Sequence, residues 1–402
     1  MKKIILASAI FTAFGAAHAG VMDDGNLSIS GFGTLGVART DTDKAEFTRY
    51  NQAEGVKDKA RIGLDSNLGL QASYKVNEQL SGTVQILTRK NTSPTFTTDL
   101  TWAFLKYKIN DELNVRVGRV VIPTFLISDY QNVGYANTMM RPPIEMYSQD
   151  PIESADGADF NYQHAFGDTN FTAQGIAGVS RGKLVLSGAS AVATYRAPVL
   201  GLSLAVEHGP VTLRMAHVEA KITSNDVAPL NALQSTLRTV GFPTLAYDLG
   251  IVNTKKVAFT EVGMLLDWNN VVGQAEYGMR RAKDPVYIPD NNAWYAMVGY
   301  RMGKVLPYYA HSAITQHGRS VTLPAGFPPA GALFNAVNGL LTSSEQGTDL
   351  VGVRWDFAKN VAMKFQVDRV KPKTKAGTLI NGPAAGLKDT VTVVAASLDF
   401  VF

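Results

Sequence analysis

Residues 394–402 read Val-Ala-Ala-Ser-Leu-Asp-Phe-Val-Phe and end the 402-residue chain. Every second position from Val394 to Phe402 is apolar, whereas Ser397 and Asp399 lie between the apolar positions. Side chains that alternate in this way lie on opposite faces of a β-strand. Because chain termini fray into water, a soluble protein rarely ends in an exposed Phe-Val-Phe. The stretch therefore predicts a final strand with one apolar face, ending where a membrane meets water.

The same two-residue period recurs upstream of this strand. It runs through residues 70–76, 351–357 and 361–367, where apolar side chains alternate with Gly, Ala or polar ones. A soluble β-sandwich would also show such a period, so the connections between strands must decide. Short polar turns are predicted at residues 77–78, 110–112, 167–168, 209–210, 269–270, 302–304 and 359–360. Longer connections are predicted at residues 39–60, 91–98, 122–156, 180–185, 223–255, 283–292, 318–347 and 373–388.

Short and long connections thus alternate along the chain, as in a transmembrane antiparallel β-barrel with tight turns at one end and long loops at the other. A direct count gives seventeen strands, but a barrel with both termini on one side needs an even number. Merging residues 189–207 into one bent strand gives sixteen strands. A barrel of eighteen strands is the fallback prediction. Pro198 and Gly201 would then mark a bulge or the descent of a loop. The predicted fold class is all-β.

Composition excludes several other classes of protein. The chain is 46% hydrophobic and 18% charged, with a mean hydropathy of -0.01. Beyond the N-terminal segment, no apolar run approaches the roughly 20 residues of a membrane-spanning helix. A net charge of +4 carries no signature of a nucleic-acid partner, and the absence of Cys excludes disulfides and thiolate metal sites. The six histidines form no metal-ligand or catalytic pattern, so we predict no metal, no cofactor and no catalytic residue.

The first nineteen residues resemble a secretory signal. Lys2 and Lys3 precede an apolar run, which ends in Ala17-His18-Ala19. A charged start, a short apolar core and a small-x-small site are the features of a cleaved signal peptide. We therefore expect residues 1–19 to be removed and residues 20–402 to form the barrel.

Several segments resemble the Gram-negative outer-membrane porin superfamily. They are the Gly-rich opening strand at 27–36, the stretch Val-Gly-Arg at 117–119, the segment 133–157, and the last strand. The last strand, with Phe400 and Phe402, is similar to the signal read by the barrel-assembly machinery. The resemblance implies a 16-stranded barrel and a homotrimer in the outer membrane, in contact with lipid and lipopolysaccharide. It also implies passage of small hydrophilic solutes.

The opening strand also contains a weak match to a nucleotide-binding motif. Gly31, Gly33 and Gly36 fit G-x-G-x-x-G, which binds dinucleotides only between a strand and a helix. Here the glycines lie inside the alternating segment itself. Close packing against the small-residue face is the preferred interpretation.

The connection at 122–156 is long enough to fold into a barrel lumen, and it follows the fifth predicted strand. Its charged residues are one base and five acids: Arg141, Asp129, Glu145, Asp150, Glu153 and Asp156. The preceding window, residues 57–119, has ten bases and six acids. An acidic loop facing a basic wall would set a transverse field across a constriction. The alternative is that these charges are simply solvated.

Alternation also predicts which charged side chains face the lumen, because a charge facing lipid at mid-membrane costs about 2–4 kcal/mol for Arg or Lys. The predicted wall residues are Lys75, Arg116, Glu276, Arg354, Asp356 and Lys364. Three more, which lie near strand ends, are Arg61, Arg89 and Arg119. The aromatic side chains of the loop, among them Tyr130 and Tyr147, could form a solute track, but packing against the wall is favoured. Apolar runs at 227–233 and 330–341 predict short external helices.

These observations predict a passive diffusion channel with a constriction at the acidic loop. A solute-specific channel for aromatic or acidic nutrients is the alternative within the same class. A secreted or outer-membrane enzyme is the alternative from another class, and it lacks a recognisable nucleophile and base.

Overall fold

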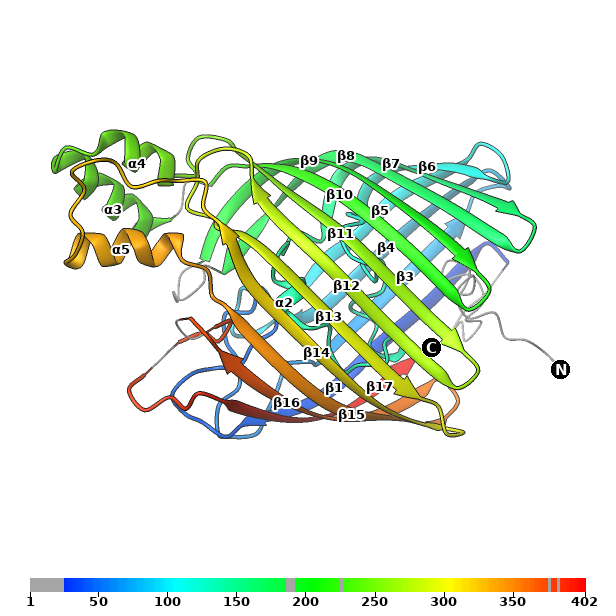
Figure 1. Ribbon diagram of the computed structural model, residues 1–402. Helices are drawn as coiled ribbons and strands as arrows, with labels where there is room; N and C mark the ends of the chain where they lie inside the picture. The colour runs from blue at the N-terminus through cyan, green and yellow to red at the C-terminus, as the bar shows by residue number, and fades with distance from the viewer. Residues whose placement is uncertain (1–24, 186–191, 225–226, 375–376, 382–383) are drawn as a thin grey trace.

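The computed structural model describes residues 25–185, 192–224, 227–374, 377–381 and 384–402. The predicted signal segment, residues 1–19, lies outside the described residues. The described chain forms one antiparallel sheet that closes on itself (Figure 1). Its first nine strands are β1 Leu27–Thr40, β2 Arg61–Ile62, β3 Asn67–Lys75, β4 Leu80–Lys90, β5 Phe96–Lys108, β6 Leu113–Val121, β7 Ser154–Phe166, β8 Thr169–Val185 and β9 Val192–His208. The others are β10 Val211–Ile222, β11 Lys255–Trp268, β12 Val271–Ala282, β13 Asp290–Tyr300, β14 Val305–Gly318, β15 Gln346–Ala358, β16 Val361–Pro372 and β17 Val391–Val401.

The second barrel strand is interrupted. Both β2 and β3 pair with β1, which places them end to end along a single neighbour. The four residues between them, 63–66, lie opposite only two residues of β1. The seventeen segments therefore make sixteen barrel strands, as predicted, and the fallback of eighteen is wrong. Closure is made by β17, which pairs with β1 from Phe32↔Val401 to Thr40↔Val393.

All seven predicted short turns join neighbouring strands at the end of the barrel where the C-terminus lies (Figure 1). The predicted loop at 180–185 is wrong, because β8 continues to Val185. The expected bulge is also absent, since the β8–β9 register runs unbroken past Pro198 and Gly201. On its other side, β9 pairs with β10 as far as Val199 and then again at Arg196. The break falls at Pro198, which has no N–H to donate.

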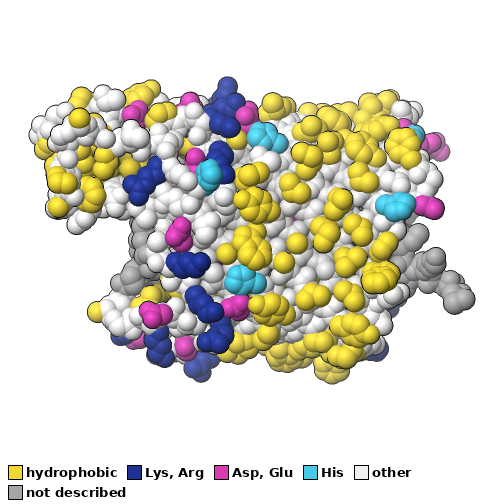
Figure 2. All heavy atoms as spheres, viewed as in Figure 1, with side chains coloured by type: hydrophobic (Ala, Val, Ile, Leu, Met, Phe, Trp, Pro, Cys, Tyr) yellow, Lys and Arg dark blue, Asp and Glu magenta, His cyan; other side chains and the backbone are white. Residues whose placement is uncertain are grey.

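The outer surface of the barrel is apolar. Figure 2 shows apolar side chains over most of the visible barrel wall, with charged side chains gathered towards the end that carries the long loops. Trp268 and Trp355 lie near the short turns and Trp294 lies towards the opposite end, with exposed fractions of 59%, 44% and 39%. Aromatic side chains at both ends of an apolar wall are typical of barrels that span a membrane.

The seam between β1 and β17 is filled by aromatic rings. Phe400 lies opposite Gly33, and Gly31 exchanges two backbone hydrogen bonds with Phe402. A Cβ atom on Gly31 would overlap the Phe402 ring, and one on Gly33 would overlap the Phe400 ring. These two glycines of the G-x-G-x-x-G match therefore provide room for rings on the outer face, in keeping with the packing interpretation.

Three of the described helices lie in the long loops outside the barrel, two of them where an apolar run predicted a helix. They are α3 (Ala228–Thr239), α4 (Pro243–Leu249) and α5 (Ala332–Leu341), and they extend beyond the barrel end (Figure 1). Their apolar faces share one cluster with residues of neighbouring loops, including Val286 and Phe327. Among the described residues, no helix has both the length and the apolar character needed to cross a membrane.

Candidate functional site

The third long loop, residues 122–153, lies inside the barrel. It joins β6 to β7 and contains the 3-10 helix η1 (Gly134–Ala136) and the one-turn helix α2 (Ile144–Tyr147). Most of its residues are buried. Its side chains and backbone bond to inward-facing residues of β12, β14, β15 and β16, on the wall opposite its origin. The loop therefore crosses the lumen.

Arg141, the only base in the loop, is a buried anchor. Its guanidinium donates to both carboxylate oxygens of Asp65 at 2.8 and 2.7 Å, and to Asp368 of β16 at 2.6 Å. The Arg141 side chain is only 4% exposed. Asp65 lies in the interruption between β2 and β3, so the break in that strand supplies one of the two carboxylates.

Glu145 in α2 is a second anchor. Its carboxylate accepts hydrogen bonds from the hydroxyl of Ser312 at 2.8 Å, the amide of Gln346 at 2.6 Å and the hydroxyl of Thr348 at 2.5 Å. These donors belong to β14 and β15, and Glu145 is 1% exposed. Its charge is thus held by the wall and does not face open water.

Two wall bases hold the tip of the loop through its backbone. Arg354 donates to the carbonyl oxygens of Tyr135 and Asn137 at 2.7 and 3.0 Å, and also pairs with Asp356 at 2.8 Å. Lys364 donates to the Gly134 carbonyl at 2.7 Å and forms a 3.1 Å ion pair with Asp399.

The aromatic side chains of the loop pack in the barrel interior. Phe125 stacks on Tyr147 with ring centroids 4.3 Å apart. The rings of Phe125 and Phe259 of β11 meet in an edge-to-face arrangement. The Tyr147 hydroxyl donates to Glu276 of β12 at 2.6 Å. Tyr130 belongs to the same buried cluster. This arrangement agrees with packing rather than with an open solute track.

The first long loop, residues 41–60, also enters the barrel mouth. The Tyr50 hydroxyl donates to Glu153 at 2.8 Å. Arg89 of β4 donates to both oxygens of the same carboxylate, at 2.9 and 3.0 Å. Although burial acts to raise the pKa of Glu153, the charge of Arg89 and the Tyr50 hydroxyl hold it below its usual value. Asn51 bonds to the backbone of Lys183 and Val185 in β8, so this loop reaches across the mouth.

Two arginines of the wall lie near Asp129 of the third loop, and each is paired with a carboxylate of the wall. Arg116 of β6 forms a bidentate ion pair with Asp159 of β7, and Arg214 of β10 pairs with Glu261 of β11. Asp129 lies within electrostatic range of both arginines. Burial raises the pKa of Asp129 above its usual value, and the charges of Arg116 and Arg214 oppose that rise.

Asp150 joins the two ends of the third loop. Its carboxylate accepts a 3.0 Å hydrogen bond from the Thr124 hydroxyl and a 3.2 Å bond from the Ile152 N–H. Burial raises the pKa of Asp150 to about 6, against the opposing effect of these two donors and of the Arg280 charge.

The remaining predicted site residues lie away from this group. Arg61 pairs with Glu54 at 2.7 Å at the barrel mouth, and Lys75 is exposed at the opposite end of the barrel. Arg119 pairs with Asp156, directly across from it on β7, at 2.7 Å. Phe400 and Phe402 lie at the outer seam.

Four wall residues were missed by the sequence reasoning: Lys106, Asp159, Arg214 and Glu261. A signal was present, because Arg214 lies between the exposed Leu213 and Met215 and thus has the inward position on its strand. Applying the inward–outward alternation of side chains to β5, β7, β10 and β11 would have identified these four wall residues. Among the described residues, no group of three or more acids and histidines could hold a metal ion.

A closed antiparallel barrel with an apolar exterior and loops folded into a charged lumen is the architecture of an outer-membrane channel. The chain belongs to the Gram-negative porin family, whose model matches residues 6–371. It is therefore a non-enzymatic protein of the outer membrane, and its class is that of the porins.

Solved porin structures share this fold. Salmonella typhi OmpF, in a complex with daunomycin, aligns at a TM-score of 0.56 and 14% identity over 95% of this chain and 100% of its own. An anion-selective porin from Comamonas acidovorans aligns at 0.55 and 12% over 94% and 99%. The trimer form of Vibrio cholerae OmpT, folded in vitro, aligns at 0.54 and 13% over 94% and 100%. No curated protein sequence matches the chain at a significant level.

Proposed function

We propose that the chain forms a water-filled pore for passive diffusion of small hydrophilic solutes and ions, with its constriction between the third loop and the β6–β10 wall. The observation that carries the proposal is the position of Asp129, which is half-buried and within electrostatic range of Arg116 and Arg214. Opposite charges on the two sides of a narrow passage orient dipolar solutes and grade ions.

The other acids of the loop contribute less to this field. Glu145 is enclosed by donors from the wall, and Glu153 is neutralised by Arg89. Asp129 and Asp150 remain partly exposed, and no cation lies within salt-bridge distance of either among the described residues. We therefore expect the selectivity of the constriction to depend chiefly on these two carboxylates.

The proposal is tested in planar lipid bilayers with the purified full-length barrel. The wild-type protein should give discrete ohmic conductance steps, and Asp129→Asn should shift the zero-current potential in a KCl gradient towards anion preference. The matched control is Asp168→Asn, which removes an exposed charge at a short turn outside the lumen. An unchanged potential for Asp129→Asn would contradict the constriction, and absence of conductance from a folded barrel would contradict the channel.

The predicted processing and assembly belong to the same proposal. We expect removal of residues 1–19, so that N-terminal sequencing of the mature protein begins at Gly20. Phe400 and Phe402 are proposed to act as the signal for the barrel-assembly machinery, and the apolar outer wall to contact lipid and lipopolysaccharide. A homotrimer is supported by the fold shared with Vibrio cholerae OmpT, for which a trimer form is known. Light scattering of the detergent-solubilised protein measures the oligomeric state.

A further inference from the structure

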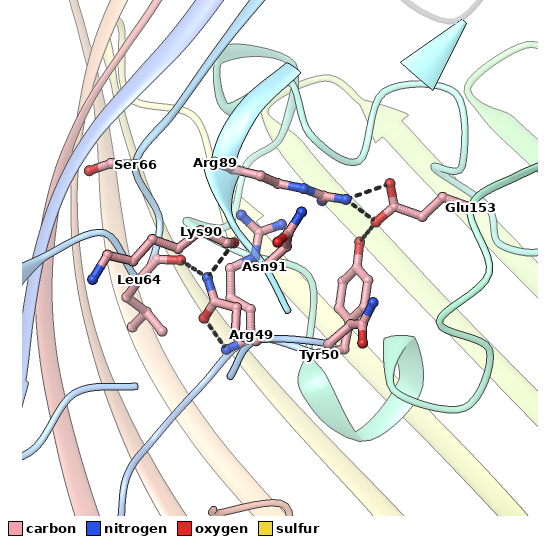
Figure 3. Close-up of a pocket in the computed structure, with 10 residues that line it drawn as sticks. Arg49, Tyr50, Leu64, Ser66, Arg89, Lys90, Asn91 and Glu153 are labelled. Atoms are coloured by element: carbon pink, nitrogen blue, oxygen red, sulfur yellow. Dashed lines mark hydrogen bonds and ion pairs between the residues drawn. The ribbon is translucent and has the colours of Figure 1, made fainter. Parts of the chain in front are cut away.

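A pocket lies where the first and third loops meet the wall of the barrel mouth (Figure 3). Its enclosed space is about 20 Å³, room for one small polar group, and the rest of the pocket opens to solvent. The polar part of its lining consists of Arg49, Tyr50, Asn51, Gln52, Ser66, Arg89, Lys90, Asn91 and Glu153. The side chain of Gln52 fixes the first loop in place, because its amide donates to the backbone carbonyls of Leu64 and Lys90 and its oxygen accepts from the Arg49 N–H.

The charges around this pocket do not balance. Arg89 is neutralised by Glu153 (Figure 3). Lys90 forms a 2.9 Å ion pair with Glu54, which does not belong to the lining. No carboxylate of the described residues lies within salt-bridge distance of Arg49. Arg49 therefore carries an excess positive charge at the mouth of the pore.

Two guanidinium nitrogens in the lining have no protein partner. They are Nη2 of Arg49 and Nε of Arg89, and both are buried. A buried N–H without an acceptor is costly, so such groups favour an acceptor from outside the protein. Carboxylate and phosphate groups both match the planar fork of a guanidinium.

We propose that this pocket binds the carboxylate group of a small organic anion, with Arg49 as the principal ligand, before the solute reaches the constriction. The negative charge of Glu153 lies beside the site and disfavours a dianion such as phosphate relative to a monoanion. Tyr50 and Leu64 give the pocket an apolar side for the body of the solute. The inference goes beyond the proposed diffusion pathway, since a site of this kind binds its solute in the absence of any current.

Isothermal titration of sodium benzoate into the detergent-solubilised full-length protein tests the site. Wild-type protein should bind benzoate, and benzamide, which has the same shape without the charge, should not bind. Arg49→Gln should weaken benzoate binding by roughly tenfold or more, because it removes a charged hydrogen bond. The matched control is Lys59→Gln, which removes an exposed positive charge of the same loop outside the pocket and should leave affinity within about twofold.

A second variant keeps the test decisive if Arg49→Gln does not fold, as judged by the heat-modifiable gel shift. Arg49→Lys keeps the charge but loses the fork, so it should bind benzoate several-fold more weakly than wild type. Equal affinity of the folded variants and wild type would overturn the proposal. Tighter binding of inorganic phosphate than of benzoate would overturn the carboxylate assignment. Loss of KCl conductance, measured separately, bears on the channel and not on this site.

Discussion

At the barrel seam, two residues without side chains determine how two rings are placed. Gly31 and Gly33 face outwards on β1, and the rings of Phe402 and Phe400 lie over them from β17. The same solution recurs on the inner face, where the Phe32 ring covers Gly69. A ring lying across a neighbouring glycine shields the backbone and pins the register of the two strands.

Replacement of Gly33 by Val should weaken the seam. The new side chain would displace the Phe400 ring, and overpacking of this kind costs about 1–3 kcal/mol. The urea midpoint of unfolding, followed by gel mobility without boiling, should fall. The control is Gly82→Val, since the space around Gly82 on β4 is open apart from an ordinary contact with Leu105. A midpoint lowered equally by both changes would show that any outward-facing valine has this effect.

At the scale of an element, the third loop is held by buried polar groups distributed along its length. Arg141, Glu145 and Tyr147 bond to β12, β14, β15 and β16. The backbone of the tip is held in turn by Arg354 and Lys364. Since the anchors are spread over four strands, the loop is fixed at several points along the opposite wall.

Arg141→Met should loosen this loop more than any other single change in it. It leaves Asp65 and Asp368 buried without a cation, and breaking such a pair costs about 3–5 kcal/mol. We expect a lower urea midpoint and faster proteolysis within residues 122–153. The triple variant Arg141→Met, Asp65→Asn, Asp368→Asn should recover part of the loss, because the unpaired charges are removed. Identical stability of the single variant and wild type would show that the pair is not an anchor.

The existence of this loop could be predicted from the sequence, but its anchors could not. Its length and its excess of acids are local properties, visible in a single stretch of residues. The partners of Arg141 lie 76 and 227 positions away, so only the closed barrel brings them together. The first loop was missed as a part of the mouth for the same reason, since Asn51 meets β8 more than 130 residues along the chain.

At the scale of the whole molecule, strand alternation predicted the wall well because lipid and water impose opposite demands on its two faces. The structure places three of the predicted wall residues, Arg116, Arg354 and Lys364, on the inner side of the barrel or in contact with the third loop. The alternation failed at the end of β8, which continues through the charged residues Arg181 and Lys183 to Val185. Those charges are exposed towards the loop end of the barrel, where the outer surface is no longer apolar.

The selectivity of the pore should depend on pH through Asp150. Its pKa of about 6 means that the carboxylate is charged at neutral pH and becomes neutral as the pH falls to about 5. Cation preference, measured by the zero-current potential in a KCl gradient, should therefore decrease over this interval. The folded chain also binds this proton more tightly than an ordinary Asp, so Asp150 adds to the free energy of unfolding as the pH falls through 6. Asp150→Asn should remove the pH-dependent decrease in cation preference. A wild-type zero-current potential that does not change with pH would contradict the prediction.

The ring-filled seam also bears on the order in which the molecule can be built. β1 is translated well before β17, so the first barrel strand must wait for its closing partner. Pairing across almost the whole chain is slow, because the entropy of closing so long a loop is lost before any contact is gained. Until β17 has been made, Gly31 and Gly33 of β1 lack the rings that cover them in the closed barrel. Closure of the seam therefore follows synthesis of the strand that carries Phe400 and Phe402.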